Sequence, residues 1–332
     1  MSVHSASRAL TLGRVAGPSP RARIVVRAAV GCALLAFAVS RARLSELTLP
    51  GGEAIVGGIA AAVLLLTGAL LMSAVRWWLV LGPGLVPLGS LVRLYFVGQF
   101  FSLFLPTSIG GDAVRILALS RGGTATGRAV SSVLIERLLG VGALLTYLVL
   151  GGLMTPALFS SPMKQLSWAA GWRGVLTLVI VGGLAVGLFL ALARRWLPLQ
   201  RLLHDARSVW ARFCLSPLPF AAAVLVSLVV QATYVLVWYV LAVILHLAVP
   251  LRALLVFVPF VSLAAMLPVT ISGLGVREGA WTLLLAPLGI SSASAIGFSL
   301  LFYLANLITG VLGGGVYMTR GADVGRAGSR LA

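Results

Sequence analysis

The stretch Leu-Pro-Thr-Ser-Ile-Gly-Gly-Asp-Ala-Val-Arg at residues 105–115 has a second copy, Leu-Pro-Val-Thr-Ile-Ser-Gly-Leu-Gly-Val-Arg, at residues 267–277. The two copies align without a gap, and six of their eleven residues are identical. Each copy places a proline, glycine and an arginine inside apolar sequence, where proline breaks a continuous helix and a charge is costly. Duplicated helix breaks of this kind are typical of substrate sites in transporters.

The composition around these motifs is that of an integral membrane protein. Of 332 residues, 60% are hydrophobic and only 10% are charged, and the mean hydropathy is +1.08. The formal net charge is +18, and the basic residues are concentrated at the ends of apolar runs. This distribution follows the positive-inside rule and argues against nucleic acid as a partner. We therefore expect an all-α polytopic protein of the cell membrane.

Six apolar runs predict full membrane spans, since about 20 residues suffice to cross a bilayer. The run at 24–40 also resembles a cleaved signal peptide, although a polytopic body favours a retained span. The domain organisation that we expect is a basic cytoplasmic tail at 1–23, a transmembrane domain at 24–318 and a second basic cytoplasmic tail at 319–332. The predicted spans are 24–40, 54–75, 129–150, 174–193, 220–245 and 293–317.

The distribution of arginines predicts how the two motif regions enter the membrane. If both crossed fully, the five arginines of residues 194–212 would lie outside, against the positive-inside rule. If each motif is instead the tip of a re-entrant helical hairpin, both tails are cytoplasmic. Three full spans then separate the hairpins, so the hairpins enter from opposite sides as inverted repeats and meet at a polar cavity near the bilayer midplane.

Two further segments predict contacts with the membrane surface. Arg76, Trp77 and Trp78 close one apolar run, which is typical of a charged and aromatic belt at the interface. In residues 199–213, the apolar residues fall on one face of a helix and the charged residues fall away from it. This amphipathic pattern fits either a membrane-surface connector or a lipid sensor. Gly310 and Gly314 are spaced for close packing of one span against a neighbour.

Six charged residues lie in or beside apolar sequence, and their formal charges sum to zero. An isolated charge at the bilayer centre costs about 2.5 to 3.5 kcal/mol, so we expect these residues to pair with one another. Asp112 could alternatively cap the N-terminus of a helix. The six residues are Asp112, Arg115, Glu136, Arg137, Arg277 and Glu278.

Each motif places glycines before a short helix that carries an arginine. Gly110, Gly111, Gly273 and Gly275 allow positive φ or a close approach of helices. The first turn of such a helix offers free N–H groups to an anion, and an adjacent arginine can fork onto a phosphate. Two roles for the motif arginines follow, and they are compatible: binding of an anionic lipid head group, or neutralisation of the nearby carboxylates.

Motifs for catalysis, cofactors and metals are missing from the sequence. It contains no G-x-x-x-x-G-K-[ST], no G-x-S-x-G and no H-E-x-x-H. Two cysteines and three histidines form no metal-binding spacing. We expect that the protein binds no cofactor and is not an enzyme. If it were an enzyme, Glu136 would be the only plausible catalytic base.

Three stretches of the sequence resemble the flippase-like lysylphosphatidylglycerol synthase transmembrane family. They are the first motif, its continuation Ser-Ser-Val-Leu-Ile-Glu-Arg-Leu-Leu-Gly at 131–140, and Ile-Ser-Gly-Leu-Gly-Val-Arg-Glu-Gly-Ala at 271–280. The resemblance covers residues from about 50 to 318. In the family's best-known member, this module is implicated in flipping aminoacylated phosphatidylglycerol to the outer leaflet. That member also has an aminoacyl transferase domain, but here only a short basic tail follows Tyr317, so lysyl transfer is not expected.

The resemblance points to the same six charged residues as the charge argument and implies a lipid translocase. We expect the partners to be the bilayer and an anionic phospholipid or a lipid-linked glycan with a phosphate-bearing head group. The alternative is a non-transporting membrane subunit that presents a lipid-linked substrate to a separate transferase.

Overall fold

A computed structural model describes residues 51–104, 110–155, 209–211, 213, 215–266 and 273–320. All regular elements in these ranges are helices, which confirms the all-α class. The predicted spans at 24–40 and 174–193 lie outside the described residues, as do residues 1–23 and 321–332 of the two tails. Most of the predicted amphipathic helix lies outside them too, but Val209 and Phe213 are buried against Val80 and Ile135.

Four long helices are long and apolar enough to cross a membrane. Their outward faces carry large apolar side chains such as Leu64, Leu153 and Leu225, which are more than half exposed. A long helix with an apolar outward face fits a lipid environment, and four such helices make this a multi-pass membrane protein. The four helices are α2 (Gly52–Leu81), α5 (Thr126–Met154), α8 (Pro217–Ile244) and α11 (Ser292–Arg320).

Four shorter helices form two pairs, each built around one motif copy. At 10 to 17 residues they are shorter than the roughly 20 residues that a perpendicular crossing needs. Residues 105–109 and 267–272 of the motifs lie outside the described part, and the second helix of each pair begins close after them. The first pair is α3 (Leu88–Phe104) with α4 (Gly110–Arg121); the second is α9 (Leu251–Met266) with α10 (Val276–Leu285), followed by the 3₁₀ turn η3 (Ala286–Leu288).

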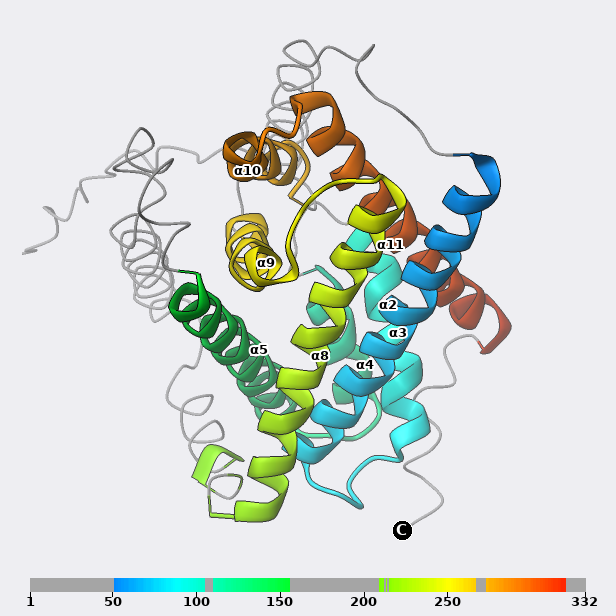
Figure 1. The fold of residues 1–332 in the computed structure, drawn as a ribbon. Helices are drawn as coiled ribbons and strands as arrows, with labels where there is room; N and C mark the ends of the chain where they lie inside the picture. The colour runs from blue at the N-terminus through cyan, green and yellow to red at the C-terminus, as the bar shows by residue number, and fades with distance from the viewer. Residues whose placement is uncertain are drawn as a thin grey trace, which may run out of the picture.

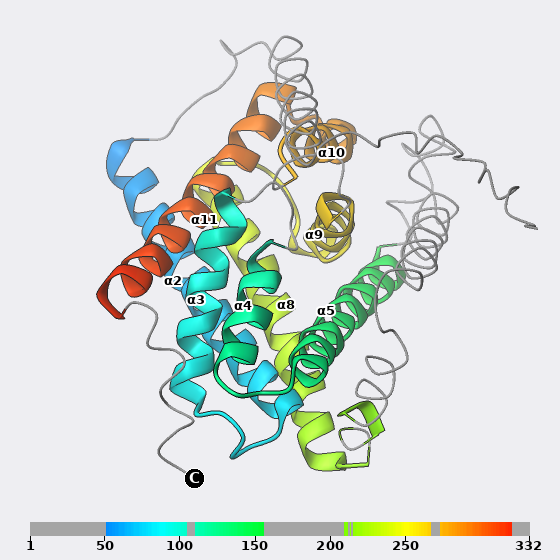
Figure 2. The same cartoon turned by 180° about the vertical axis from the view of Figure 1, so that it is seen from behind.

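The long helices α2 and α8 run side by side in opposite directions at the centre of the fold (Figures 1 and 2). Helix α3 packs against α11, and α9 packs against α5. Short connections join α2 to α3 and α8 to α9. Because α2 and α8 are antiparallel, the two helical pairs start at opposite ends of this central pair.

Glycines let the first helical pair and α11 approach closely. A Cβ on Gly111 would collide with the backbone carbonyl of Gly98 and with the hydroxyl of Ser102, so the close crossing of α3 and α4 requires glycine at this position. A Cβ on Gly314 would lie 2.7 Å from the ring of Phe100, and one on Gly310 would collide with Leu103. The close packing expected at Gly310 and Gly314 is therefore formed between α11 and α3.

The tryptophan at the end of the second predicted span is not part of an interfacial belt. Trp77 is completely buried, and it packs with Leu91 and Leu94 of α3. Its indole nitrogen donates a 3.0 Å hydrogen bond to the hydroxyl of Ser132 on α5. The interfacial prediction was wrong for Trp77 because α2 continues to Leu81, which places the indole beside α3 and α5.

Candidate functional site

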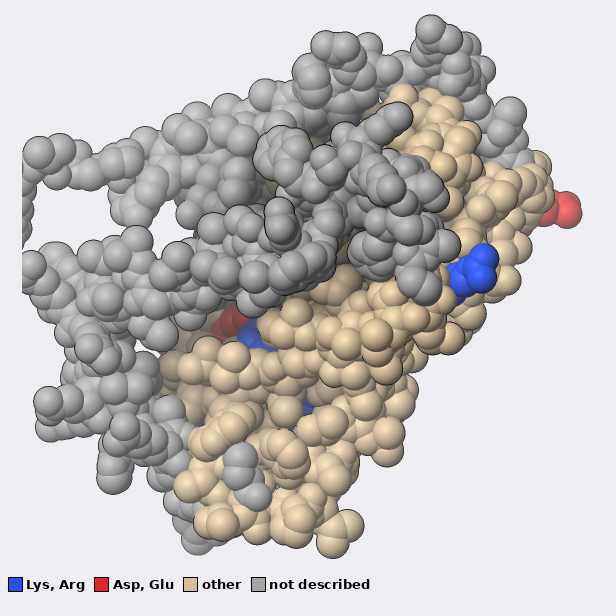
Figure 3. All heavy atoms as spheres, turned by 60° about the vertical axis from the view of Figure 1, so that its left-hand side comes forward, with Lys and Arg blue, Asp and Glu red and all other residues tan. Residues whose placement is uncertain are grey.

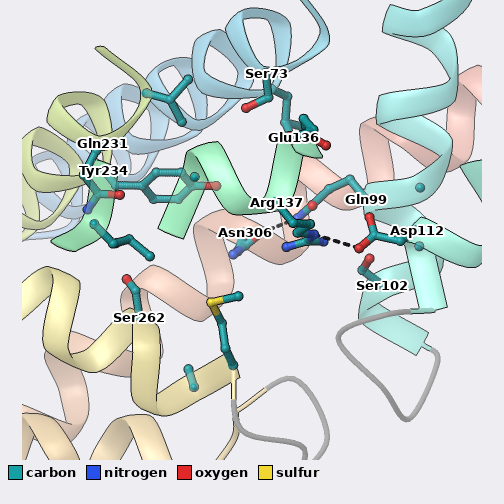
Figure 4. A pocket seen from close by; sticks show the side chains of 18 of the residues that line it. Ser73, Gln99, Ser102, Asp112, Glu136, Arg137, Gln231, Tyr234, Ser262 and Asn306 are labelled. Atoms are coloured by element: carbon teal, nitrogen blue, oxygen red, sulfur yellow. Dashed lines mark hydrogen bonds and ion pairs between the residues drawn. The ribbon is translucent and has the colours of Figure 1, made fainter. Parts of the chain in front are cut away.

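A cavity of about 350 Å³ lies between the two helical pairs, and all four long helices contribute to its wall. Gln231 and Asn306 line it from near the midpoints of α8 and α11, so the cavity lies about halfway along these helices. Figure 4 shows polar side chains from both pairs converging on this space. On the described surface, acidic and basic atoms meet in a hollow of an otherwise mainly uncharged face (Figure 3).

The first helical pair brings a network of ion pairs to the cavity wall. Arg115 of α4 donates from one guanidinium nitrogen to Asp112 at 2.5 Å and to Glu136 of α5 at 3.0 Å. Arg137 donates to the other oxygen of Asp112 at 2.7 Å. The charge pairing expected among the six residues is therefore present for these four.

Arg76 of α2 and Tyr95 of α3 complete this network. Arg76 forms an ion pair with Glu136 and lies 3.3 Å from the hydroxyl of Ser227 on α8. Tyr95 donates its hydroxyl hydrogen to the same Glu136 oxygen at 2.6 Å. The assignment of Arg76 to a membrane interface was wrong, because the arginine is 7% exposed and packs inside the bundle.

Aromatic rings hold the Arg115 guanidinium on its remaining sides. Its central carbon lies 4.2 Å from the ring centroid of Tyr95 and 4.8 Å from that of Trp77. A desolvated cation over aromatic faces gains about 2 kcal/mol or more. Only 3% of Arg115 is exposed, so the rings and carboxylates fix it in one position.

The second helical pair supplies an arginine in a different environment. Arg277 lines the cavity and lies 5.1 Å from the ring centroid of Phe302 on α11. Phe302 stacks on Trp238 of α8, with ring centroids 4.3 Å apart. The neighbouring Glu278 accepts hydrogen bonds from the Gly275 backbone N–H at 2.5 Å and from the Ser299 hydroxyl at 2.8 Å.

The formal charge of the described cavity wall is positive, not zero. Its charged residues are four arginines and two carboxylates, which gives +4 − 2 = +2. The sum differs from the expected zero because Arg76 joins the wall while Glu278 is used to cap α10. The six wall residues are Arg76, Asp112, Arg115, Glu136, Arg137 and Arg277.

The structure places most of the remaining predicted site residues at the starts of α4 and α10. Gly111 lines the cavity, whereas Gly110, Gly273, Gly275 and Glu278 lie beside it without lining it. Gly273 and Gly275 have backbone φ angles of +73° and +82°, which residues other than glycine rarely adopt. Asp112 does not cap its helix, since α4 already begins at Gly110 and both carboxylate oxygens bind arginines.

Uncharged polar residues of the cavity were missed by the sequence reasoning. The amide nitrogen of Gln99 on α3 donates to the Asn306 side-chain oxygen on α11 at 2.6 Å. Gln231 of α8 is buried, and its amide nitrogen has no hydrogen-bond partner among the described residues. A single amide in the middle of an apolar run was the signal that could have found both Gln231 and Asn306.

Among the described residues, no three histidine, cysteine, aspartate or glutamate side chains gather into a group that could hold a metal ion. What the cavity offers is a positively charged wall, neutral hydrogen-bonding groups and rings. Such a combination suits a polar anionic group that is attached to an apolar remainder.

Comparison with known families assigns most of the chain to one family. No curated protein matches the chain significantly. A family model described as the lysylphosphatidylglycerol synthase transmembrane region matches residues 24–314, which include both motif copies and all described helices up to most of α11. The chain therefore belongs to the lysylphosphatidylglycerol synthase transmembrane family.

Proposed function

We propose that the protein moves a lipid with a phosphate-bearing head group between the two leaflets and that the head group passes through the cavity. The observation that carries the proposal is that motif arginines from both helical pairs line one cavity whose wall has a formal charge of +2, about halfway along the long helices. The role is translocation without covalent change of the lipid, so the chain is not an enzyme.

The positive wall favours an anion over a neutral or cationic group. Moving an anionic head group through hydrocarbon alone carries a large desolvation cost. Guanidinium groups offset that cost by donating paired hydrogen bonds to phosphate oxygens. The starts of α4 and α10 lie at or beside the same cavity, and the positive ends of their dipoles add to the attraction.

The packing of the helices supports an inverted repeat of two units, α2 to α5 and α8 to α11. Exchanging α2 with α8, α3 with α9, α4 with α10 and α5 with α11 turns each main packing contact into another observed one. The α3–α11 contact becomes α9–α5, and the α4–α5 contact becomes α10–α11. We therefore interpret both short pairs as re-entrant hairpins that enter from opposite sides, as in transporters with alternating access.

The arginine distribution supports a cell-membrane orientation with both termini in the cytoplasm. Arg121 and Arg128 flank the turn between α4 and α5, and the arginine-rich segment 194–212 precedes α8 in the sequence. The start of α9, near the other end of α8, carries only Arg252. The positive-inside rule places the arginine-rich end in the cytoplasm.

Leaflet exchange in liposomes tests the proposed function. The purified chain is reconstituted with fluorescent phosphatidylglycerol, and a membrane-impermeant quencher reports the outer-leaflet fraction over time. We expect exchange well above that of protein-free liposomes. Exchange at the protein-free rate by folded protein would contradict translocation, and it would favour the alternative of a subunit that presents a lipid-linked substrate to a transferase.

A further inference from the structure

On one side of the cavity, three polar side chains take no part in the ion pairs. Gln231, Tyr234 and Ser262 lie on the side opposite Asp112 and Ser102 (Figure 4). These side chains are uncharged, and they come from α8 and α9. The cavity therefore has a charged side and a neutral hydrogen-bonding side.

Neither carboxylate of the wall is free to receive a cation. Both oxygens of Asp112 accept hydrogen bonds from arginines, and both oxygens of Glu136 accept from arginine or tyrosine. A third carboxylate, Glu278, directly follows the second motif in the sequence. It accepts hydrogen bonds from Gly275 and Ser299 and does not line the cavity. An ammonium group in the cavity would lose its water and meet a +2 wall without an available carboxylate.

Gln231 offers an unused donor on the neutral side. The residue is 6% exposed, it lines the cavity, and its amide nitrogen has no hydrogen-bond partner within the described ranges. A buried unpaired donor is costly, so such a group marks a place where a bound molecule supplies the acceptor. A hydroxyl oxygen of a glycerol or a sugar is an acceptor of this kind.

We propose that the lipid head group has two parts, a phosphate held by the arginine wall and an uncharged hydroxyl-bearing group held by Gln231 and its neighbours. The proposal rests on the proposed function for the site and specifies its substrate class. The volume of about 350 Å³ is near the lower end for ligand sites, so the second part is one polyol or one sugar. Head groups with an added ammonium, including aminoacylated ones, are excluded.

Binding measured in detergent separates this proposal from transport itself. The purified protein is titrated with fluorescent phosphatidylglycerol, and the unlabelled competitors are phosphatidylglycerol, a monoglycosyl polyprenyl phosphate, phosphatidic acid, phosphatidylethanolamine and lysylphosphatidylglycerol. We expect phosphatidylglycerol or the glycosyl lipid to compete at least about tenfold better than the two ammonium lipids. Whichever of the two is preferred identifies the polyol or the sugar. Equal or better competition by lysylphosphatidylglycerol would overturn the proposal.

Two variants of Gln231 test the neutral side. Gln231→Leu keeps a similar volume without the amide, and it should weaken phosphatidylglycerol binding about tenfold while phosphatidic acid, which has no hydroxyl-bearing part, binds as before. Gln231→Glu adds a carboxylate and should raise the preference for lysylphosphatidylglycerol relative to phosphatidylglycerol about tenfold. An equal change for all lipids would indicate a structural role and contradict the proposal.

The two measurements distinguish the possible failures. Selective binding without leaflet exchange would leave the head-group assignment intact and contradict translocation. Exchange of all lipids at similar rates, together with unselective binding, would support translocation and overturn the head-group assignment.

Discussion

The two helical pairs carry the same motif, yet they hold their arginines in opposite ways. Arg115 of the first pair is enclosed by two carboxylates and two rings and is 3% exposed. Arg277 of the second pair lies over one ring and is half-buried, while its neighbour Glu278 caps α10. The comparison teaches that a repeated motif fixes the backbone and the arginine position, whereas the surrounding helices decide which carboxylates and rings contact the arginine.

Removing the central carboxylate of the first pair should have the largest effect on stability. Glu136→Gln removes the carboxylate that pairs with Arg76 and one of the two that pair with Arg115, so we expect a loss of about 3 to 5 kcal/mol in the free energy of unfolding. Unfolding of the purified protein in detergent measures this loss. Glu53→Gln, at an exposed site in the first turn of α2, is the control and should stay within about 0.5 kcal/mol. Equal stabilities for the two variants would contradict the ion-pair network.

The corresponding change in the second pair should have a smaller effect. Glu278→Gln weakens hydrogen bonds to one backbone N–H and one serine hydroxyl, with a cost of at most about 1.5 to 3 kcal/mol. The same unfolding measurement applies. A loss greater than that of Glu136→Gln would reverse the proposed difference between the pairs.

Close packing of the first pair predicts an effect that does not depend on charge. Gly111→Ala places a Cβ against the carbonyl of Gly98, which should cost about 1 to 3 kcal/mol and should widen the α3–α4 crossing. Thermal unfolding, followed by tryptophan fluorescence, is a suitable measurement. An unchanged melting temperature would show that the two helices cross at a greater distance.

The smallest expected effect is a stabilisation in the second pair. Gly279 lies within α10, and a Cβ there would meet open space. Gly279→Ala should therefore raise the free energy of unfolding by about 0.5 to 1 kcal/mol. This variant is also the matched control for Gly111→Ala, and a loss of stability would indicate an additional neighbour at that position.

Local patterns predicted the helices better than they predicted contacts between helices. Apolar runs located α2, α5, α8 and α11 to within about four residues, except for the end of α2, which lies at Leu81 and not at residue 75, since hydrophobicity acts locally. The cost of membrane charges identified Asp112, Arg115, Glu136 and Arg137 as a group. Arg76 was missed because the two tryptophans after it suggest an interface. Its true position depends on packing against α5 and α8, which no local pattern encodes.

The central claim is that Arg277 binds the head group rather than only supporting the fold, and leaflet exchange by arginine variants tests it most directly. Arg277→Gln is compared with Arg252→Gln, which removes an exposed arginine from α9 outside the cavity. With both variants folded, we expect phosphatidylglycerol exchange to fall at least about tenfold for Arg277→Gln and to stay within about twofold of the wild-type rate for Arg252→Gln. Wild-type exchange by folded Arg277→Gln would contradict the claim.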